Sequence, residues 1–325
     1  MTKIKENGKL NDIKVIVIGS LNTDMIGTGF ERILGPGELT TGQTFSIGLG
    51  GKSRNIAEMS ACLLKKWQVA MLGRTVKDKF GLWKMPFYAL QKSGVITKYI
   101  KFLTKGLPGI ALIPVDTKER NQIYVLPGVN NDFSPSDILA VSKIFSKARV
   151  MTLSLELPKR TAIAAIKEAN KYDLKVILDT GGINENADNK WILKQKIFIL
   201  RPNEHETKIL TGVRVIDYKS AAKAAKKILN KNIENLLITA GKNGGYFFNT
   251  KMKKHLRVPF IKKSKFVDET GCGDQVTSVI TAAVAEGTDI YEACVLVILA
   301  GTIQFYKKGI IPVTKYELEK FRKYF

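Results

Sequence analysis

Residues 13–19 read IKVIVIG, a short run of β-branched side chains that ends at a glycine. Such a run is typical of a buried strand in a parallel sheet. Similar runs recur at residues 150–155, 175–179, 197–200 and 236–239. Segments with helical spacing of apolar residues separate them, for example at 159–171 and 220–229. This alternation predicts an α/β fold with a doubly wound parallel sheet, whose ligands bind at the carboxyl ends of the strands.

Two stretches interrupt the alternation, at residues 22–50 and at residues 98–130. The first is rich in Gly, Thr and Ile and has little helical period. The second contains a hairpin pattern, GIALIPV followed by the turn residues 116–120 and then NQIYVLPG. Together they predict a small β-sheet that covers the active site as a lid; edge strands of the main sheet are the alternative. We expect one domain over residues 13–315, with the lid as its two insertions.

The chain of 325 residues carries a formal net charge of +23, with 52 Lys and Arg against 29 Asp and Glu. The excess is mostly lysine in scattered pairs such as Lys65-Lys66, whereas arginine, which recognises phosphates and bases in bidentate geometry, is sparse. We therefore attribute the charge to a general lysine bias and expect no nucleic-acid partner. A basic face for nucleic acid is the alternative.

The three cysteines, Cys62, Cys272 and Cys294, form no C-x-x-C pair, which favours reduced thiols and a cytoplasmic location. Only two histidines occur, so a multi-histidine metal site is not expected. The N-terminal residues lack the apolar segment of a signal peptide. The longest apolar stretch, residues 293–305, is too short to span a membrane and predicts a buried helix.

Residues 266–287, FVDETGCGDQVTSVITAAVAEG, combine a glycine-rich turn with a helical pattern of small residues. Gly271 and Gly273 permit a tight turn, so that amides at the start of the helix can point at one anion. Asp274 would lie beside that anion. A phosphoryl-transfer enzyme needs both parts, because the amides and helix dipole stabilise developing charge while a carboxylate orients the attacking hydroxyl. The alternative is a structural turn with Asp274 as a helix cap.

Two further motifs lie within residues 19–55, one directly after the first predicted strand and one at the start of a predicted helix. Asn22 and Asp24, in GSLNTD, alternate onto one face of an extended chain, where both could bind a polyol. The loop GLGGKSRN, at residues 48–55, lacks the first glycine of a P-loop and the last glycine of G-x-G-x-x-G. Lys52 and Asn55, at the start of a helix, could instead bind sugar hydroxyls. An Asx turn and a structural glycine turn are the alternatives.

The motifs RPNEHE and TAGKNGG each follow a predicted strand. Asn203 and Glu206 lie one turn apart if a helix begins there, which suits water-mediated binding of Mg²⁺ near phosphates. The alternative is a helix-capping pair. The glycine turn at residues 239–245 could approach a nucleotide closely or close a hairpin.

Taken in order, these motifs resemble those of the ribokinase/PfkB carbohydrate kinases over about residues 13–315. The motifs that carry the resemblance are GSLNTD at 19–24, GGKSRN at 50–55, PGVNNDFSPSD at 127–137, SLELP at 154–158, RPNEHE at 201–206, TAGKNGG at 239–245 and DETGCGD at 268–274. The resemblance implies ATP-dependent phosphorylation of a sugar hydroxyl, on ribose or a similar small polyol. A kinase of a nucleoside or a sugar phosphate, or a weakly catalytic sugar- or nucleotide-sensing relative, remains the alternative.

The resemblance also implies a role for individual residues and a homodimer formed through the lid. Asp274 would be the catalytic base, and Gly271, Cys272 and Gly273 the anion hole. The residues that would face the sugar are Asn22, Asp24, Gly51, Lys52, Asn55 and Glu156. Those that would serve the nucleotide are Asn203, Thr239, Gly241 and Gly244. Glu206 would bind Mg²⁺ through water, and Asp268 with the backbone of Thr270 would hold a K⁺ that orders the anion hole.

Glu269, Cys272 and Gln275 depart from the residues usual in the family motif, and they put the identity of the substrate in doubt. The polar groups of the expected sugar face are hydroxyl partners, and two of them are acidic. Arg54 is expected to face solvent on its helix, and Arg120 lies in the lid turn. The sequence therefore predicts an unphosphorylated pentose or a similar neutral polyol as the acceptor, because a buried phosphate needs compensating cations.

Overall fold

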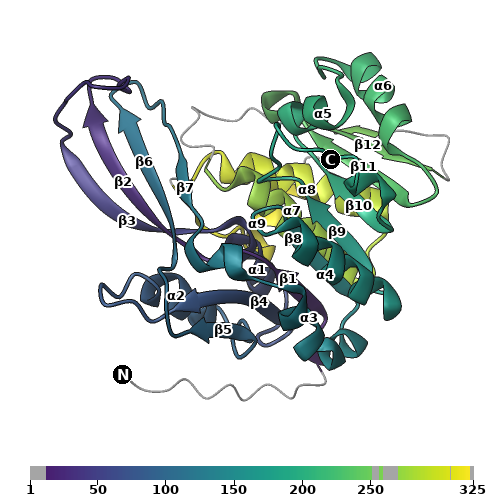
Figure 1. Ribbon diagram of the computed structural model, residues 1–325. Helices are drawn as coiled ribbons and strands as arrows, with labels where there is room; N and C mark the ends of the chain where they lie inside the picture. The colour runs from purple at the N-terminus through teal and green to yellow at the C-terminus, as the bar shows by residue number, and fades with distance from the viewer. Residues whose placement is uncertain (1–11, 251–255, 259–269, 308, 323–325) are drawn as a thin grey trace.

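The computed structural model describes residues 12–250, 256–258, 270–307 and 309–322. Its larger sheet contains nine strands within these ranges (Figure 1). Their order across the sheet is β13 (Leu256–Val258), β12 (Gly245–Asn249), β11 (Ile233–Thr239), β10 (Ile197–Arg201), β9 (Lys175–Asp179), β8 (Val150–Ser154), β1 (Val15–Ile18), β4 (Val69–Val76) and β5 (Ile100–Leu103). All neighbours from β11 to β5 are parallel, and β12 and β13 add an antiparallel edge. The predicted doubly wound sheet is confirmed.

Helices cover both faces of this sheet (Figure 1). The helices are α1 (Lys52–Leu63), α2 (Lys84–Lys92), α3 (Pro135–Ala140), α4 (Lys159–Lys171), α5 (Glu204–Thr211), α6 (Tyr218–Ile228), α7 (Cys272–Glu286), α8 (Ile290–Gln304) and α9 (Lys315–Arg322). One hydrophobic cluster joins the sheet to α1, α7 and α8, and another joins its opposite face to α3, α4 and α6. The apolar stretch predicted as a buried helix is most of α8.

Strand β1 shows why the sheet is buried on both faces. Val15 and Val17 belong to the cluster with α7, whereas Ile16 and Ile18 belong to the cluster on the other face. Successive side chains of a strand point to opposite faces, so a continuous β-branched run serves two cores at once. Each such side chain contributes roughly 1.5–3 kcal/mol when it is fully buried.

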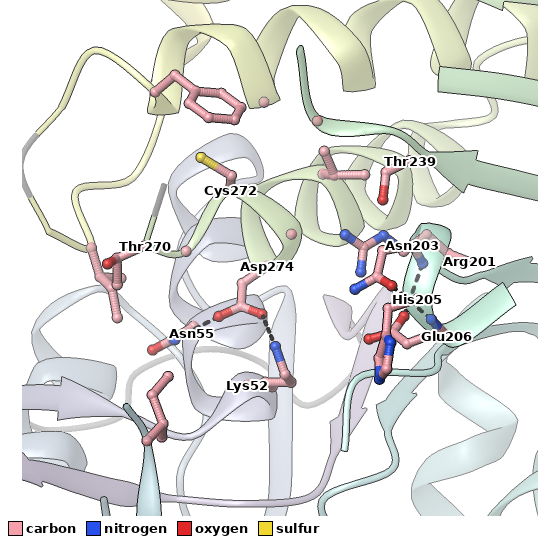
Figure 2. A pocket seen from close by; sticks show the side chains of 18 of the residues that line it. Lys52, Asn55, Arg201, Asn203, His205, Glu206, Thr239, Thr270, Cys272 and Asp274 are labelled. Atoms are coloured by element: carbon pink, nitrogen blue, oxygen red, sulfur yellow. Dashed lines mark hydrogen bonds and ion pairs between the residues drawn. The ribbon is translucent and has the colours of Figure 1, made fainter. Parts of the chain in front are cut away.

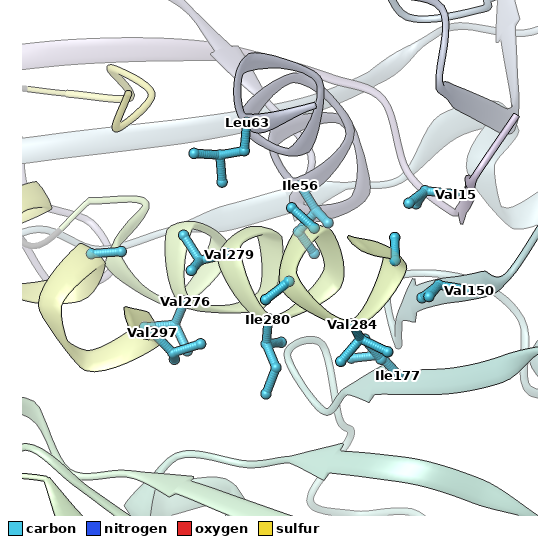
Figure 3. Close-up of a cluster of buried hydrophobic side chains, with 14 of the residues drawn as sticks. Val15, Ile56, Leu63, Val150, Ile177, Val276, Val279, Ile280, Val284 and Val297 are labelled. Atoms are coloured by element: carbon cyan, nitrogen blue, oxygen red, sulfur yellow. The ribbon is translucent and has the colours of Figure 1, made fainter. Parts of the chain in front are cut away.

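Helix α7 lies at the centre of the first cluster, where Val276, Val279, Ile280 and Val284 pack against α1, α8 and the sheet (Figure 3). Nearly every residue of α7 after its first two is buried, including Thr277, Ser278 and Thr281. Small residues let neighbouring helices approach closely on all sides. This packing fixes the position of the first turn of α7, which carries the glycine-rich motif.

The second sheet has four strands, in the order β3 (Thr44–Gly50), β2 (Asn22–Phe30), β6 (Gly109–Asp116) and β7 (Tyr124–Leu126). It projects from the larger sheet at the upper left of Figure 1. It is separate from the main sheet, so the lid prediction is confirmed and the edge-strand alternative is wrong. Of the stretch 98–130, residues 100–103 instead pair with β4 in the main sheet as β5.

The register of the lid sheet divides its side chains between two faces. Asp24 pairs with Ala111, which pairs with Val125, and all three line the cavity described below. The next position along, Met25, pairs with Ile47 and Leu112, which point away from the cavity. The lid therefore presents one face to the cavity and an apolar face on its other side.

Candidate active site

One cavity of about 590 Å³ lies between the lid and the carboxyl ends of the strands, at the first turn of α7. It is large enough for a small-molecule ligand. The structure brings to it every sequence-predicted site residue that it describes: Asn22, Asp24, Gly51, Lys52, Asn55, Glu156, Asn203, Glu206, Thr239, Gly241, Gly244, Thr270, Gly271, Cys272, Gly273 and Asp274. Asp268 and Glu269 lie outside the described residues. Figure 2 shows ten of the lining residues with labels.

Asp274 lies in the first turn of α7 and is 4% exposed. Gly271 precedes this helix with φ of 75°, a left-handed conformation that favours glycine and turns the chain sharply into the helix. Asn55 Nδ2 donates to Asp274 Oδ2 at 2.7 Å, and Lys52 Nζ lies 3.6 Å from Oδ1 (Figure 2). The Asp274 carboxylate raises the pKa of Lys52, which keeps this lysine charged.

The side of the cavity beneath the lid is polar and acidic. Glu156 Oε2 accepts a hydrogen bond from the backbone N–H of Lys52 at 3.0 Å and another from the hydroxyl of Ser20. Burial raises the pKa of Glu156, and it raises the pKa of Asp24 to about 6. Asn130 Nδ2 donates to Asn22 Oδ1 at 2.8 Å and thereby fixes the orientation of that amide. These groups can accept and donate hydrogen bonds to several hydroxyls.

On the opposite side, Asn203 and Glu206 form a capping box at the start of α5. Asn203 Oδ1 accepts from the Glu206 N–H at 2.8 Å, and Glu206 Oε2 accepts from the Asn203 N–H at 2.9 Å and from Thr180 Oγ1 at 2.7 Å. The capping alternative is therefore correct, although both residues also line the cavity. The glycine turn after Thr239 closes the β11–β12 hairpin, and it also lines the cavity.

Mg²⁺ is implied by the family resemblance, and the residues present fit a hydrated ion that is bound mainly to nucleotide phosphates. The described residues contain no cluster of three or more metal-ligating side chains. A Mg²⁺ bound to nucleotide phosphates needs only one or two carboxylates and keeps several waters. Glu206 supplies a carboxylate on the cavity wall, close to Asn203. This donor chemistry suits a hydrated Mg²⁺.

K⁺ is also implied by the family resemblance, but Asp268, one of the two groups expected to bind it, lies outside the described residues. The backbone carbonyl of Thr270 accepts a hydrogen bond from Gln304 Nε2 at 3.4 Å, and the same amide donates to the Gly309 carbonyl at 2.8 Å. Gln304 is fully buried, and its Oε1 has no hydrogen-bond partner among the described residues. K⁺ binding beside Thr270 therefore stays a prediction. No step proposed below uses K⁺.

The expectation that Arg54 faces solvent is wrong. Arg54 is fully buried, forms an ion pair with Glu58 and donates to Asn55 Oδ1. The start of α1 packs against α7 and β3, so helical position alone does not decide exposure there. Arg120, in the lid turn, is paired with Asp116 at 2.6 Å. Both arginines are engaged within the chain.

Sequence reasoning missed Arg201 as a site residue. It ends β10 beside Asp179, which ends β9, and Arg201 Nη1 donates to Asp179 Oδ2 at 3.1 Å. Thr277 of α7 donates to the same carboxylate oxygen at 2.6 Å. Arg201 also lines the cavity. Its signal in the sequence was a charged residue that closes a buried apolar strand, immediately before the P-N motif.

A glycine turn at a helix N-terminus, a buried carboxylate beside it and a polar cavity wall under a lid sheet are features expected of an enzyme that transfers a phosphoryl group to a hydroxyl. The chain belongs to the pfkB family of carbohydrate kinases, whose family model matches residues 12–315. It is therefore a carbohydrate kinase. No helix in the described ranges has the length and apolar character needed to cross a membrane.

Individual relatives agree with this assignment. The ribokinase of Haemophilus influenzae is 31% identical over 306 residues, which cover 93% of this chain and 96% of that protein. The deoxyribokinase of Salmonella typhi is 28% identical over 295 residues, which cover 91% and 93%. A structure of Arabidopsis thaliana ribokinase complexed with ribose and ATP matches with a TM-score of 0.84 and 26% identity, over 96% of this chain and 99% of that chain.

Proposed function

We propose that this carbohydrate kinase transfers the γ-phosphoryl group of ATP to a hydroxyl of ribose or a similar small neutral polyol. The observation that carries the proposal is the placement of Asp274. Its Oδ2 is held by Asn55, and it lies one residue after the glycine turn that begins α7. A base and an anion-binding turn are thus adjacent at the floor of one cavity.

In the proposed reaction, the oxygen of the acceptor hydroxyl attacks the γ-phosphorus of ATP. The bond from that phosphorus to its bridging oxygen breaks, and ADP leaves with the electron pair. The hydroxyl proton passes to the carboxylate of Asp274. The backbone N–H groups of the Gly271–Cys272–Gly273 turn and the dipole of α7 stabilise the charge on the phosphoryl oxygens. Glu206 would hold Mg²⁺ through water, and the ion would neutralise phosphate charge.

In this proposal the nucleotide binds on the side of Asn203, Thr239 and the glycine turn at residues 241–244. Asn203 follows β10 and Thr239 ends β11, at the carboxyl edge where doubly wound sheets bind ligands. The likeness to a ribokinase crystallised with ribose and ATP supports the same nucleotide here. The lid and the residues Asn22, Asp24 and Glu156 are then left for the acceptor.

The charge of the acceptor side supports a neutral acceptor. Asp24, Glu156 and Asp274 line it, and Lys52, which lines it too, is paired with Asp274. Arg54 and Arg120 are each committed to a carboxylate of the chain itself. A phosphate group on the acceptor would face these carboxyl groups without an unpaired cation to compensate its charge. A hydroxyl-bearing acceptor suits the same groups as hydrogen-bond partners.

The test is a panel of acceptors assayed by ADP production: ribose, deoxyribose, fructose, adenosine and fructose 6-phosphate. We expect the highest kcat/KM for a free pentose. A clear preference for fructose 6-phosphate would contradict the neutral-acceptor proposal, and a preference for adenosine would reassign the enzyme to nucleosides. Nucleotide binding without phosphorylation of any acceptor would favour a sensing protein instead.

We further propose a homodimer through the lid. Phe45, Ile47, Leu112, Tyr124 and Leu126 on its outer face are between 40% and 66% exposed. An apolar sheet face of this kind is costly to leave in water and is common at protein interfaces. A second copy of the chain offers the same face in return, as the interface of a two-fold dimer requires.

A further inference from the structure

Arg201 is a buried cation placed against the anion-binding turn. Its side chain is 5% exposed, yet it lines the cavity. A Cβ atom on Gly273 would lie 2.7 Å from Arg201 Nη2, so the guanidinium lies directly against the backbone of that glycine. Figure 2 shows the Arg201 side chain beside Asn203 and directed toward the first turn of α7. Glycine at position 273 is what allows this approach.

The chain itself uses only part of the guanidinium. Arg201 Nη1 is paired with Asp179, whose carboxylate also accepts from Thr277 and from the Gly181 N–H at 2.8 Å. Arg201 Nε is buried and has no hydrogen-bond partner among the described residues. A buried donor without a partner costs free energy, and a guanidinium offers five N–H groups in a planar fork. The fork is therefore incompletely satisfied by the protein.

We propose that Arg201 is a catalytic residue that binds the oxygens of the phosphoryl group during transfer. The inference rests on the proposed kinase function and adds a residue to it. The amides of the turn and the Arg201 guanidinium bound the same part of the cavity, between Asp274 and Asn203. As the bond to ADP breaks and the bond to the acceptor oxygen forms, negative charge spreads over the equatorial oxygens. A guanidinium matches such oxygens in bidentate geometry.

Asp179 acts here as a positioning residue. Arg201 and Asp179 pair in register at the ends of adjacent parallel strands, so the guanidinium is held from behind by a rigid part of the sheet. Nearby carboxylates, with Asp179 first, outweigh desolvation and raise the pKa of Arg201. The side chain therefore meets an incoming phosphate fully charged, with little freedom left to lose.

The experiment compares Arg201→Met and Arg201→Lys with the full-length wild type. We expect Arg201→Met to lower kcat by roughly 10²–10³-fold, the range for loss of one preorganised donor. Calorimetry with a non-hydrolysable ATP analogue and with ADP shows whether Arg201 contacts the γ-phosphate, which ADP lacks. Loss of a charge-assisted contact should weaken binding of the analogue by about tenfold and leave ADP binding unchanged. Arg201→Lys keeps the charge and should retain an intermediate kcat.

Arg74→Met is the matched control. Arg74 is also a largely buried arginine paired with a carboxylate, Asp137, and its Nε likewise has no hydrogen-bond partner among the described residues. It does not line the cavity. Arg74→Met should lower the Tm, as loss of a buried ion pair does, and leave kcat and both nucleotide affinities unchanged.

Three results would overturn the inference. One is wild-type kcat in a folded Arg201→Met variant. Another is an equal loss of affinity for ADP and for the ATP analogue. That result would mean that Arg201 has a structural role or binds the part of the nucleotide that both ligands share. The third is failure of the wild type to bind either nucleotide, which would refute the proposed kinase function itself and is read directly from the wild-type titration.

Discussion

Asn55 and Asp274 are 219 residues apart in sequence, and in the structure Asn55 Nδ2 donates to Asp274 Oδ2 at 2.7 Å in a buried position. Arg54 donates to the other end of the same amide, so the Asn55 side chain has one satisfactory orientation. Asp274 Oδ1 has no hydrogen-bond partner among the described residues. The packing of α1 on α7 thus leaves Asp274 Oδ1 without a hydrogen bond, with the Lys52 ammonium 3.6 Å away.

Replacing Asp274 with Asn should abolish most catalysis without unfolding the protein. The amide keeps the size of the carboxylate but cannot take the hydroxyl proton, so we expect kcat to fall by roughly 10²–10⁴-fold. Steady-state ADP production measures kcat, and Tm with ATP-analogue affinity monitors folding and binding. A folded Asp274→Asn variant with near-wild-type turnover would remove Asp274 from the mechanism.

Asp24→Asn should stabilise the protein at neutral and alkaline pH. Burial raises the pKa of Asp24 from an ordinary 3.8 to about 6, against the opposing effect of Arg54. The folded state therefore holds this proton more tightly than the unfolded chain does, and the wild type loses stability as pH rises from about 4 through about 6. Above that range we expect Asp24→Asn to be more stable by roughly 1–3 kcal/mol.

Thermal unfolding from pH 4.5 to 8 measures this difference. The gain in Tm of Asp24→Asn over wild type should be largest at pH 8 and shrink toward pH 4.5. Asp188→Asn, the same change at an exposed side chain, serves as the control. A difference in Tm between Asp24→Asn and wild type that does not vary with pH would contradict the raised pKa.

Turnover should be higher in K⁺ than in Na⁺ or in a bulky organic cation, because a K⁺ beside the Thr270 backbone would order the glycine turn at the start of α7. The Gln304 amide already donates to the carbonyls of Thr270 and Gly309, which ties the residue before the anion-binding turn to the segment after α8. Rates at matched ionic strength measure the effect. Gln304→Ala removes the donor and should lower the rate in every buffer. Equal rates of the wild type in all three buffers would contradict the K⁺ prediction.

The sequence predicted the set of cavity residues better than it predicted their local surroundings. Asn22, Lys52 and Asp274 belong to motifs that follow strands or begin helices, and the carboxyl ends of parallel strands meet at one edge of the sheet. The fold class followed from the same alternation of strands and helices. Local pattern was sufficient for these features because each depends on neighbours in sequence.

Contacts between distant segments were not predictable in this way. Arg54 occupies a helical position that would face solvent in a simple amphipathic helix, but α1 is enclosed where it meets α7 and the lid. Arg201 becomes a site residue only when β10 is placed beside β9 and against Gly273 of α7. Gln304 contacts a carbonyl 34 residues earlier. Each depends on the order of strands or helices in space.

The last prediction concerns the proposed lid dimer. Phe45 is 66% exposed on the outer face of the lid, and Phe80, outside the lid, is 68% exposed. Placing an Asp at position 45 would bury an unpaired carboxylate between two lids, which is costly, so Phe45→Asp should convert the dimer to a monomer. Phe80→Asp introduces the same charge at the same exposure and should remain dimeric. Light scattering after size-exclusion chromatography measures the mass of each, and a wild type that is monomeric at micromolar concentration would refute the lid interface.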